Sequence, residues 1–205
     1  MRIGCWNVFV LAIAAGVIGD LRAADPPRML TPVVSGATRL CSDDGPACVI
    51  VAPQGTDDRH GQAVARAVTG RRAAAPRLLS PDEALDPEGP RLRAELMGRP
   101  VVVLGNINTN RAVLPFYARF QSFADADYPG PGAYAIRTAY RPWGTAVNAI
   151  IIEATDDAGM TVGVTRFAAI VAALPATGVL DFPYTLESKG ARPLQGIAKA
   201  SDKRV

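Results

Sequence analysis

Short, continuous apolar runs alternate with amphipathic stretches through the middle of the chain. The runs at 49–52 and 101–104 each lead into a loop that contains glycine, a pattern typical of a strand buried on both faces. After the first run, Asp57 or Asp58 can cap a helix. Residues 77–79 form a brief third run, which predicts one more short strand. The first half of the domain is therefore predicted to alternate strand and helix.

A second helix is expected after the 101–104 run, with caps supplied by the asparagines at 106–110. Pro115 opposes this helix unless the helix begins near Ala112, because an interior proline costs about 3 kcal/mol. One face of the predicted helix is apolar or aromatic and consists of Val113, Tyr117, Phe120 and Ala124.

The second half of the domain predicts a hairpin and a long helix. Residues 133–138 alternate like a half-exposed strand, and residues 147–153 return as a more buried one. Asp156 or Asp157 caps the helix that follows, and Pro175 ends it. Two glycines one turn apart let this helix approach a sheet closely. Its apolar face is made by Met160, Val164, Phe167, Val171 and Leu174.

The resulting order, β-α-(β)-β-α-β-β-α, predicts an α/β fold with α+β-like features: a mixed β-sheet with about three packed helices. The predicted domain spans residues 47–176. Residues 24–46, rich in proline, arginine and small polar residues, are expected to form an extended leader, and 177–205 a C-terminal extension or tail.

The first segment is predicted to be a secretory signal peptide, residues 1–23. Arg2 precedes an apolar run at 8–18, and small residues follow, with cleavage expected near Ala23. Eleven helical residues rise only about 16 Å, so a membrane anchor is the weaker alternative. The mature chain is expected to be secreted or periplasmic, with no membrane association after cleavage.

Export also bears on the cysteines. Removal of the signal peptide leaves Cys41 and Cys48, separated by a turn-forming interval around Asp44-Gly45-Pro46. In an oxidising compartment this pair is expected to form a disulfide, worth about 2–3 kcal/mol for so short a loop. Two thiols without a nearby histidine do not make a zinc site, and no metal site is predicted.

Length and composition exclude several classes. The 205 residues are 49% hydrophobic and 20% charged, which excludes disorder throughout, and they are too few for a complete (β/α)8 barrel. The net charge is only +3, and the arginines are scattered without interleaved aromatic residues, so nucleic acid is not an expected partner. Neither nucleotide-binding fingerprint is present, and no cofactor is predicted.

Candidate chemistry is sparse. His60 is the only histidine, and an enzyme hypothesis must use it, with Asp57 or Asp58, as a small hydrolase or lyase. No Gly-x-Ser-x-Gly motif supplies a nucleophile, so a solvated histidine in the first helical turn is the preferred interpretation. No catalytic residue is therefore assigned.

Candidate ligand contacts follow the 101–104 run. Asn106, Asn108 and Asn110 can hydrogen-bond sugar hydroxyls, or can cap the helix and hold turns, which we prefer. Trp143 is a candidate for stacking on a sugar ring.

Residues 101–174 carry a pattern of packing motifs. The segments read V-V-V-L-G-N-I-N-T-N (101–110), P-G-P-G-A-Y-A-I-R-T (129–138), V-N-A-I-I-I-E-A-T-D (147–156) and D-A-G-M-T-V-G-V-T-R-F (157–167). This pattern resembles the α/β accessory domain that precedes the catalytic barrel in hexosaminidase-type and α-glucuronidase-type glycoside hydrolases. The positions that match the family are Gly105, Gly132, Tyr134, Ile136, Gly159, Gly163 and Phe167.

The resemblance implies a polysaccharide-processing context, with a polysaccharide or a catalytic barrel domain as partner. In that family the catalytic residues belong to the barrel, so none is carried over. The expected function is an exported, non-catalytic α/β domain that gives structural support or binds a glycan weakly. The alternatives are the His60 enzyme and a small-ligand or protein-binding module that uses the loops after the 48–52 and 101–104 strands. The sequence does not predict an oligomeric state.

Overall fold

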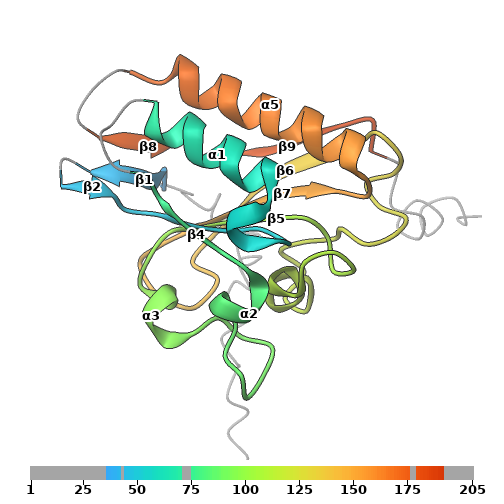
Figure 1. Ribbon diagram of the computed structural model, residues 1–205, viewed down its shortest axis with the longest axis horizontal. Helices are drawn as coiled ribbons and strands as arrows, with labels where there is room; N and C mark the ends of the chain where they lie inside the picture. Colours follow the sequence, from blue (N-terminus) through green and yellow to red (C-terminus); the bar gives the residue numbers. More distant parts are fainter. Residues whose placement is uncertain (1–35, 43, 71–74, 176–178, 192–205) are drawn as a thin grey trace, which may run out of the picture. The chain divides into compact units, whose positions relative to one another are not determined.

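The computed structural model describes residues 36–42, 44–70, 75–175 and 179–191. The predicted signal peptide, residues 1–23, lies outside the described residues, as does the first part of the predicted leader, residues 24–35. The described ranges form two β-sheets with helices packed against them (Figure 1).

The larger sheet has six strands in the order β4-β3-β5-β7-β6-β9. The first four run parallel to one another, and β6 and β9 run antiparallel to their neighbours. This mixed sheet confirms the α/β fold class that the sequence predicts. The strands are β3 (Val49–Val51), β4 (Arg77–Leu79), β5 (Val101–Leu104), β6 (Tyr134–Ala139), β7 (Ala149–Ala154) and β9 (Leu186–Lys189).

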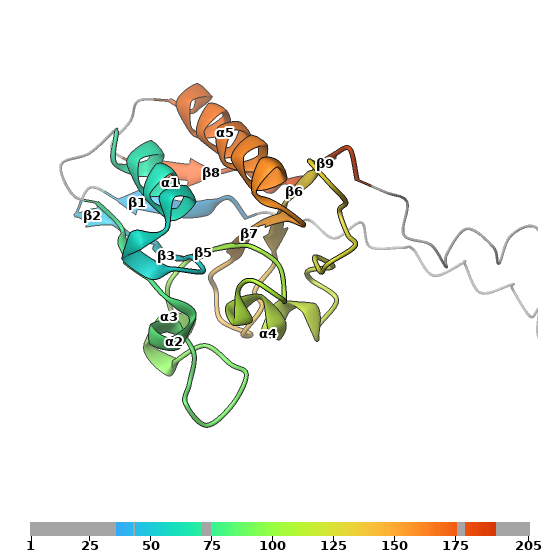
Figure 2. The same ribbon diagram turned by 45° about the vertical axis from the view of Figure 1, so that its right-hand side comes forward.

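Helices cover both faces of this sheet (Figures 1 and 2). The two longest, α1 and α5, lie side by side on one face, and α2, α3 and α4 lie on the other. The helical segments are η1 (Gly55–Asp57), α1 (Arg59–Thr69), α2 (Pro81–Ala84), α3 (Ala94–Met97), η2 (Arg111–Val113), α4 (Leu114–Tyr117) and α5 (Asp157–Ala173). In the described ranges, no helix is long and apolar enough to span a bilayer.

The strand side chains alternate between two hydrophobic cores. Ile50, Val102 and Ile152 point toward α1 and α5, where they meet residues such as Val64 and Phe167. Their sequence neighbours point the other way, into a second core beneath α2, α3 and α4. Burial on both faces explains why these strands read as continuous apolar runs instead of alternating polar and apolar residues.

A smaller antiparallel sheet has the order β2-β1-β8 (β2, Gly45–Pro46; β1, Thr38–Ser42; β8, Leu180–Phe182). The sequence places β1 and β2 in an extended leader and β8 and β9 in a tail, so the ordered part of the chain is larger than predicted. The physical reason is apolar burial. Phe182 stacks on Phe167 of α5, with ring centroids 5.0 Å apart, and Leu40 is fully buried in the same core.

A helix is predicted with Val113, Tyr117, Phe120 and Ala124 on one face. The prediction is wrong for the residues after Tyr117, which are not helical. A 3-10 turn leads into α4, which ends at Tyr117. Pro115 lies in the first turn of α4, where a proline is tolerated, so it does not stop the helix. The helix stops because the Phe120 N–H donates to the Tyr117 carbonyl and the Gln121 N–H to the Phe116 carbonyl, a capping pattern that places Phe120 at a φ of 56°.

Cys41 lies in β1 of the smaller sheet and Cys48 directly before β3, and both are buried thiols in the structure. The Ala47 and Cys48 N–H groups both donate to the Leu40 carbonyl, which holds the two cysteines on adjacent segments. Burial, followed by the nearby Cys41, raises the pKa of Cys48 to about 12. The predicted disulfide between them stays a prediction.

Candidate functional site

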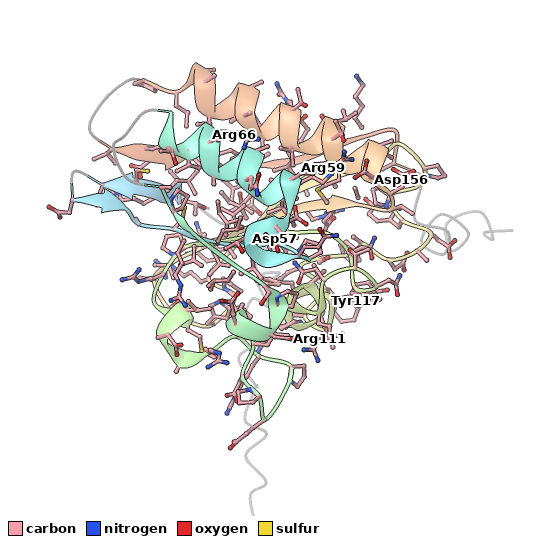
Figure 3. The ribbon with its side chains drawn as sticks, in the orientation of Figure 1. Asp57, Arg59, Arg66, Arg111, Tyr117 and Asp156 are labelled. Atoms are coloured by element: carbon pink, nitrogen blue, oxygen red, sulfur yellow. The ribbon has the colours of Figure 1, made fainter. Side chains whose placement is uncertain are left out.

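A crevice of about 640 Å³ lies at the carboxyl ends of β3, β5 and β7. The chain leaves β3 toward α1 on one face of the sheet and leaves β5 toward η2 and α4 on the other face. Such a reversal between adjacent parallel strands opens a gap outside their carboxyl ends, where ligands of open α/β sheets bind. The first turns of α1 and α5 form the other wall (Figure 3).

Two aspartates fix these helix starts. The Asp58 carboxylate accepts hydrogen bonds from the His60 and Gly61 N–H groups at 3.0 and 2.8 Å, and Asp156 accepts from the Gly159 N–H at 2.8 Å. Asp156 also accepts from the Gly132 N–H, and these backbone bonds hold its pKa below the usual range. Of the alternatives left open by the sequence, Asp58 caps α1 and Asp156 caps α5.

Side chains in the first turns of α1 and α5 bind each other. The His60 Nε2 lies 2.9 Å from the Asp157 Oδ1, and Arg59 binds the second oxygen of the same carboxylate. These hydrogen bonds, first from His60 and then from Arg59, lower the pKa of Asp157. His60 is only 15% exposed at its side chain, so it is not the solvated histidine that the sequence favours. Its partner is Asp157, and neither Asp57 nor Asp58 takes that place.

The side chains of Asn106 and Asn110 link neighbouring strands of the sheet by hydrogen bonds. The Asn110 amide, fully buried, donates to the Val51 and Leu104 carbonyls at 3.2 and 2.7 Å and so joins β3 to β5. Asn106 donates to the Ala154 carbonyl at 2.8 Å, and its oxygen accepts from the Asn108 and Thr109 N–H groups. The hydrogen-bonding groups of both side chains are engaged within the protein, as the capping alternative requires.

The four predicted ligand contacts do not gather in one place. Asn106 lines the crevice, Asn108 is exposed beside it and Asn110 is buried below. Trp143 packs on the other face of the sheet, where its ring meets Phe116 edge-to-face at 5.2 Å. Thr155, which follows β7, and Asp157, the first residue of α5, also line the crevice, and sequence analysis did not name them as candidate ligand contacts. The one signal for them is that they directly follow a parallel strand.

Asp57, Gln54 and Arg59 add polar groups to the rim, and Figure 3 shows Asp57, Arg59 and Asp156 around the starts of the two helices. Pro53, Leu104 and Met160 give the crevice apolar surface. The two hydroxyls present are both engaged with backbone: Thr109 accepts from the Asn106 N–H and Thr155 from the Gly130 N–H. In the described part of the chain no cluster of three or more His, Cys, Asp or Glu side chains is placed to hold a metal ion.

The carboxyl groups divide by environment. Asp156 and Asp157, in the crevice, have lowered pKa values and stay ionised, whereas burial raises the pKa of Glu153, which lies under the sheet against Arg137. A glycosidic general acid needs a raised pKa within reach of the substrate. Asp156 and Asp157 therefore offer hydrogen-bond acceptors in the crevice.

The fold and site together define an open α/β sheet with a crevice of polar and apolar residues at its carboxyl edge. No protein-family model matches the chain, and no curated protein matches it.

Proposed function

We propose that this chain is a non-catalytic α/β domain that binds a small carbohydrate in the crevice at the carboxyl ends of β3, β5 and β7. The observation that carries the proposal is the convergence of three parallel strands and two helix starts on one crevice of about 640 Å³ that has both polar and apolar lining. That volume falls within the roughly 300–1,000 Å³ of small-molecule sites.

The chemistry of the crevice suits a sugar. The Asp57 and Asp157 carboxylates and the Gln54 amide accept hydrogen bonds from hydroxyls, and Arg59 and the amide donate them. Leu104 and Met160 supply apolar contact for the C–H faces of a ring. The resemblance of residues 101–174 to the accessory domain of glycoside hydrolases supports the same class of ligand.

The crevice test is a thermal-shift measurement against a panel of neutral and acidic mono- and disaccharides. A binder at a hundred times its Kd stabilises the folded state by about 2.7 kcal/mol, so the Tm should rise. Asp157→Ala should weaken binding by about tenfold or more, equivalent to about 1.4 kcal/mol, because the carboxylate acceptor is lost.

The matched control is Asp181→Ala, which removes an exposed aspartate paired with Arg39, away from the crevice. This variant should bind the sugar as the unmodified chain does. The proposal is wrong if no saccharide of the panel raises the Tm, or if Asp157→Ala binds as tightly as the control.

A second candidate function rests on the 2.9 Å contact between His60 and Asp157, the geometry in which a carboxylate orients a histidine base. On this hypothesis the chain is a small hydrolase or lyase, and His60→Ala abolishes turnover while the chain stays folded. The crevice lining includes no serine or cysteine nucleophile, which favours binding. Measurable glycosidase or lyase turnover that disappears in His60→Ala would establish the enzyme instead.

Export belongs to the same proposal, with a polysaccharide or a catalytic barrel domain as partner. The apolar run at 8–18 and the paired Cys41 and Cys48 support it. Protein recovered from an oxidising compartment should have the mass of residues 24–205 less two hydrogen atoms, because the signal peptide is removed and the disulfide forms. Intact mass spectrometry measures both. An unprocessed N-terminus contradicts cleavage of a signal peptide, and two alkylatable thiols after unfolding contradict the disulfide.

A further inference from the structure

An aromatic and basic surface lies at the opposite end of β7 from the crevice. It consists of Arg119, Phe120, Tyr140, Arg141 and Trp143, and we call it the Phe120 surface. Its two segments meet where the Gln121 amide donates to the Tyr140 carbonyl and where Arg119 stacks over the Trp143 ring. Phe120 is 80% exposed and Tyr140 40% exposed. The neighbouring helix α4 lies under the sheet, away from α1 and α5 (Figure 2).

Phe120 is exposed because of its backbone position. It lies three positions after Tyr117, the last residue of α4, and has a φ of 56°, at the place in the capping pattern where a glycine usually stands. A bulky side chain strains this conformation and is directed into solvent. Arg141, the other non-glycine residue with positive φ in the described ranges, lies on the same surface. Strain and an exposed ring at one place indicate a role in contact with another molecule.

The two arginines of the surface are cations stacked on aromatic rings. The guanidinium carbon of Arg119 lies 5.0 Å from the centre of the Trp143 ring, and that of Arg141 lies 5.1 Å from the centre of the Tyr140 ring. In the part of the chain that the structure describes, neither guanidinium pairs with a carboxylate. The Arg119 Nη1 also donates to the Pro115 carbonyl at 3.2 Å, which orients this guanidinium. A guanidinium has five N–H groups, so a stacked one can still bind a planar anion through its edge.

From these contacts we infer that the Phe120 surface binds an acidic polysaccharide, one with carboxylate or sulfate groups along the chain. The guanidinium edges bind the anionic groups, and the exposed rings contact the C–H faces of the sugars. Charge complementarity selects an anionic polymer, and the choice of a polysaccharide rests on the carbohydrate context of the proposed function. The surface is separated from the crevice by the length of β7, so one domain can contact two parts of a glycan.

Affinity electrophoresis of the full chain in gels that contain polygalacturonate tests the inference, with dextran as the neutral polymer. Polygalacturonate should retard the chain and dextran should not. The double variant Arg119→Ala/Arg141→Ala should raise the Kd by about tenfold or more. Phe120→Gly should raise it by about fivefold while the Tm stays the same or rises, because glycine suits the positive φ and only the ring is lost.

The matched control is Arg66→Ala/Arg77→Ala, which removes the same charge from α1 and β4, distant from this surface. If the control lowers retardation as much as Arg119→Ala/Arg141→Ala, binding depends on net charge alone and the inference is wrong. Retardation by single-stranded DNA but not by polygalacturonate also overturns it, in favour of a nucleic acid. Asp157→Ala separates the two sites: it should weaken small-sugar binding in the crevice by about tenfold or more and leave retardation by polygalacturonate unchanged.

Discussion

Replacement of Arg137 by methionine should lower the free energy of unfolding by about 3–5 kcal/mol at neutral pH. The Arg137 guanidinium lies 2.8 Å from the carboxylate of Glu153, which has no exposed surface. It also donates to the Tyr128 hydroxyl at 2.8 Å and lies 5.1 Å from the centre of the Phe123 ring. Methionine preserves much of the volume but leaves a buried carboxylate without its counter-charge, and that loss dominates.

The deficit should depend on pH. Burial raises the pKa of Glu153 even with Arg137 present, so the folded state holds this proton more tightly than the unfolded state does. A group of this kind contributes stability that is present below its unfolded pKa and is lost as the pH rises through its folded pKa. In Arg137→Met the folded pKa rises further. Denaturant titrations at neutral and mildly acidic pH should therefore show the deficit shrinking as the pH falls.

Two further variants make the result specific. Arg137→Met/Glu153→Leu should recover most of the lost stability, because an apolar pair of similar volume needs no counter-charge. Arg39→Met breaks an exposed pair with Asp181, and it should cost less than about 1 kcal/mol. An equal effect of Arg137→Met and Arg39→Met would show that burial of Glu153 has no energetic consequence.

Gly159→Ala should be the second severe substitution, with a loss of about 3 kcal/mol in unfolding free energy. A Cβ atom at Gly159 would lie 2.1 Å from the Ala133 carbonyl oxygen, which is backbone and cannot swing away. Alanine favours a helix over glycine by about 1 kcal/mol, but the clash displaces the start of α5 from the loop before β6 and is the larger effect. Thermal or denaturant unfolding measures the difference.

Gly98 provides the matched control, since a Cβ there would meet nothing within 4 Å. Gly98→Ala should change stability by less than about 0.5 kcal/mol. Gly163→Ala should fall between the two, because its Cβ would lie 3.1 Å from the Cβ of Tyr134. A loss in Gly159→Ala no greater than in Gly98→Ala would mean that α5 can shift on the sheet without cost.

The larger sheet, apart from β9, could be predicted because its signals are local. The runs that became β3 and β5 are continuous and apolar, and the spacing of Met160, Val164 and Phe167 fixed the buried face of α5. The two glycines of α5 were correctly interpreted as permitting close approach to the sheet, since Gly159 meets Ala133 and Gly163 meets Tyr134.

The smaller sheet could not be predicted because its signals are distant. β1 pairs with β8, and the Arg39 and Asp181 side chains that join them are 142 positions apart. Each strand is short, and it is the burial of Leu40, Leu180 and Phe182 in the core beside α5 that stabilises the pair. The same limit applies to the site. His60 was singled out, but its partner Asp157 lies 97 positions away, at the end of another strand.

The two edge strands of the larger sheet, β4 and β9, affect whether copies of the chain associate with one another. β4 has only three residues and begins with an exposed arginine. β9 has four and carries Glu187, bound to Arg166 and Tyr134, and the exposed Lys189. Short, charged outer strands are poor templates for a strand of a neighbouring molecule. A sheet whose centre is almost wholly aliphatic can thus remain dispersed at high concentration instead of growing by edge-to-edge aggregation.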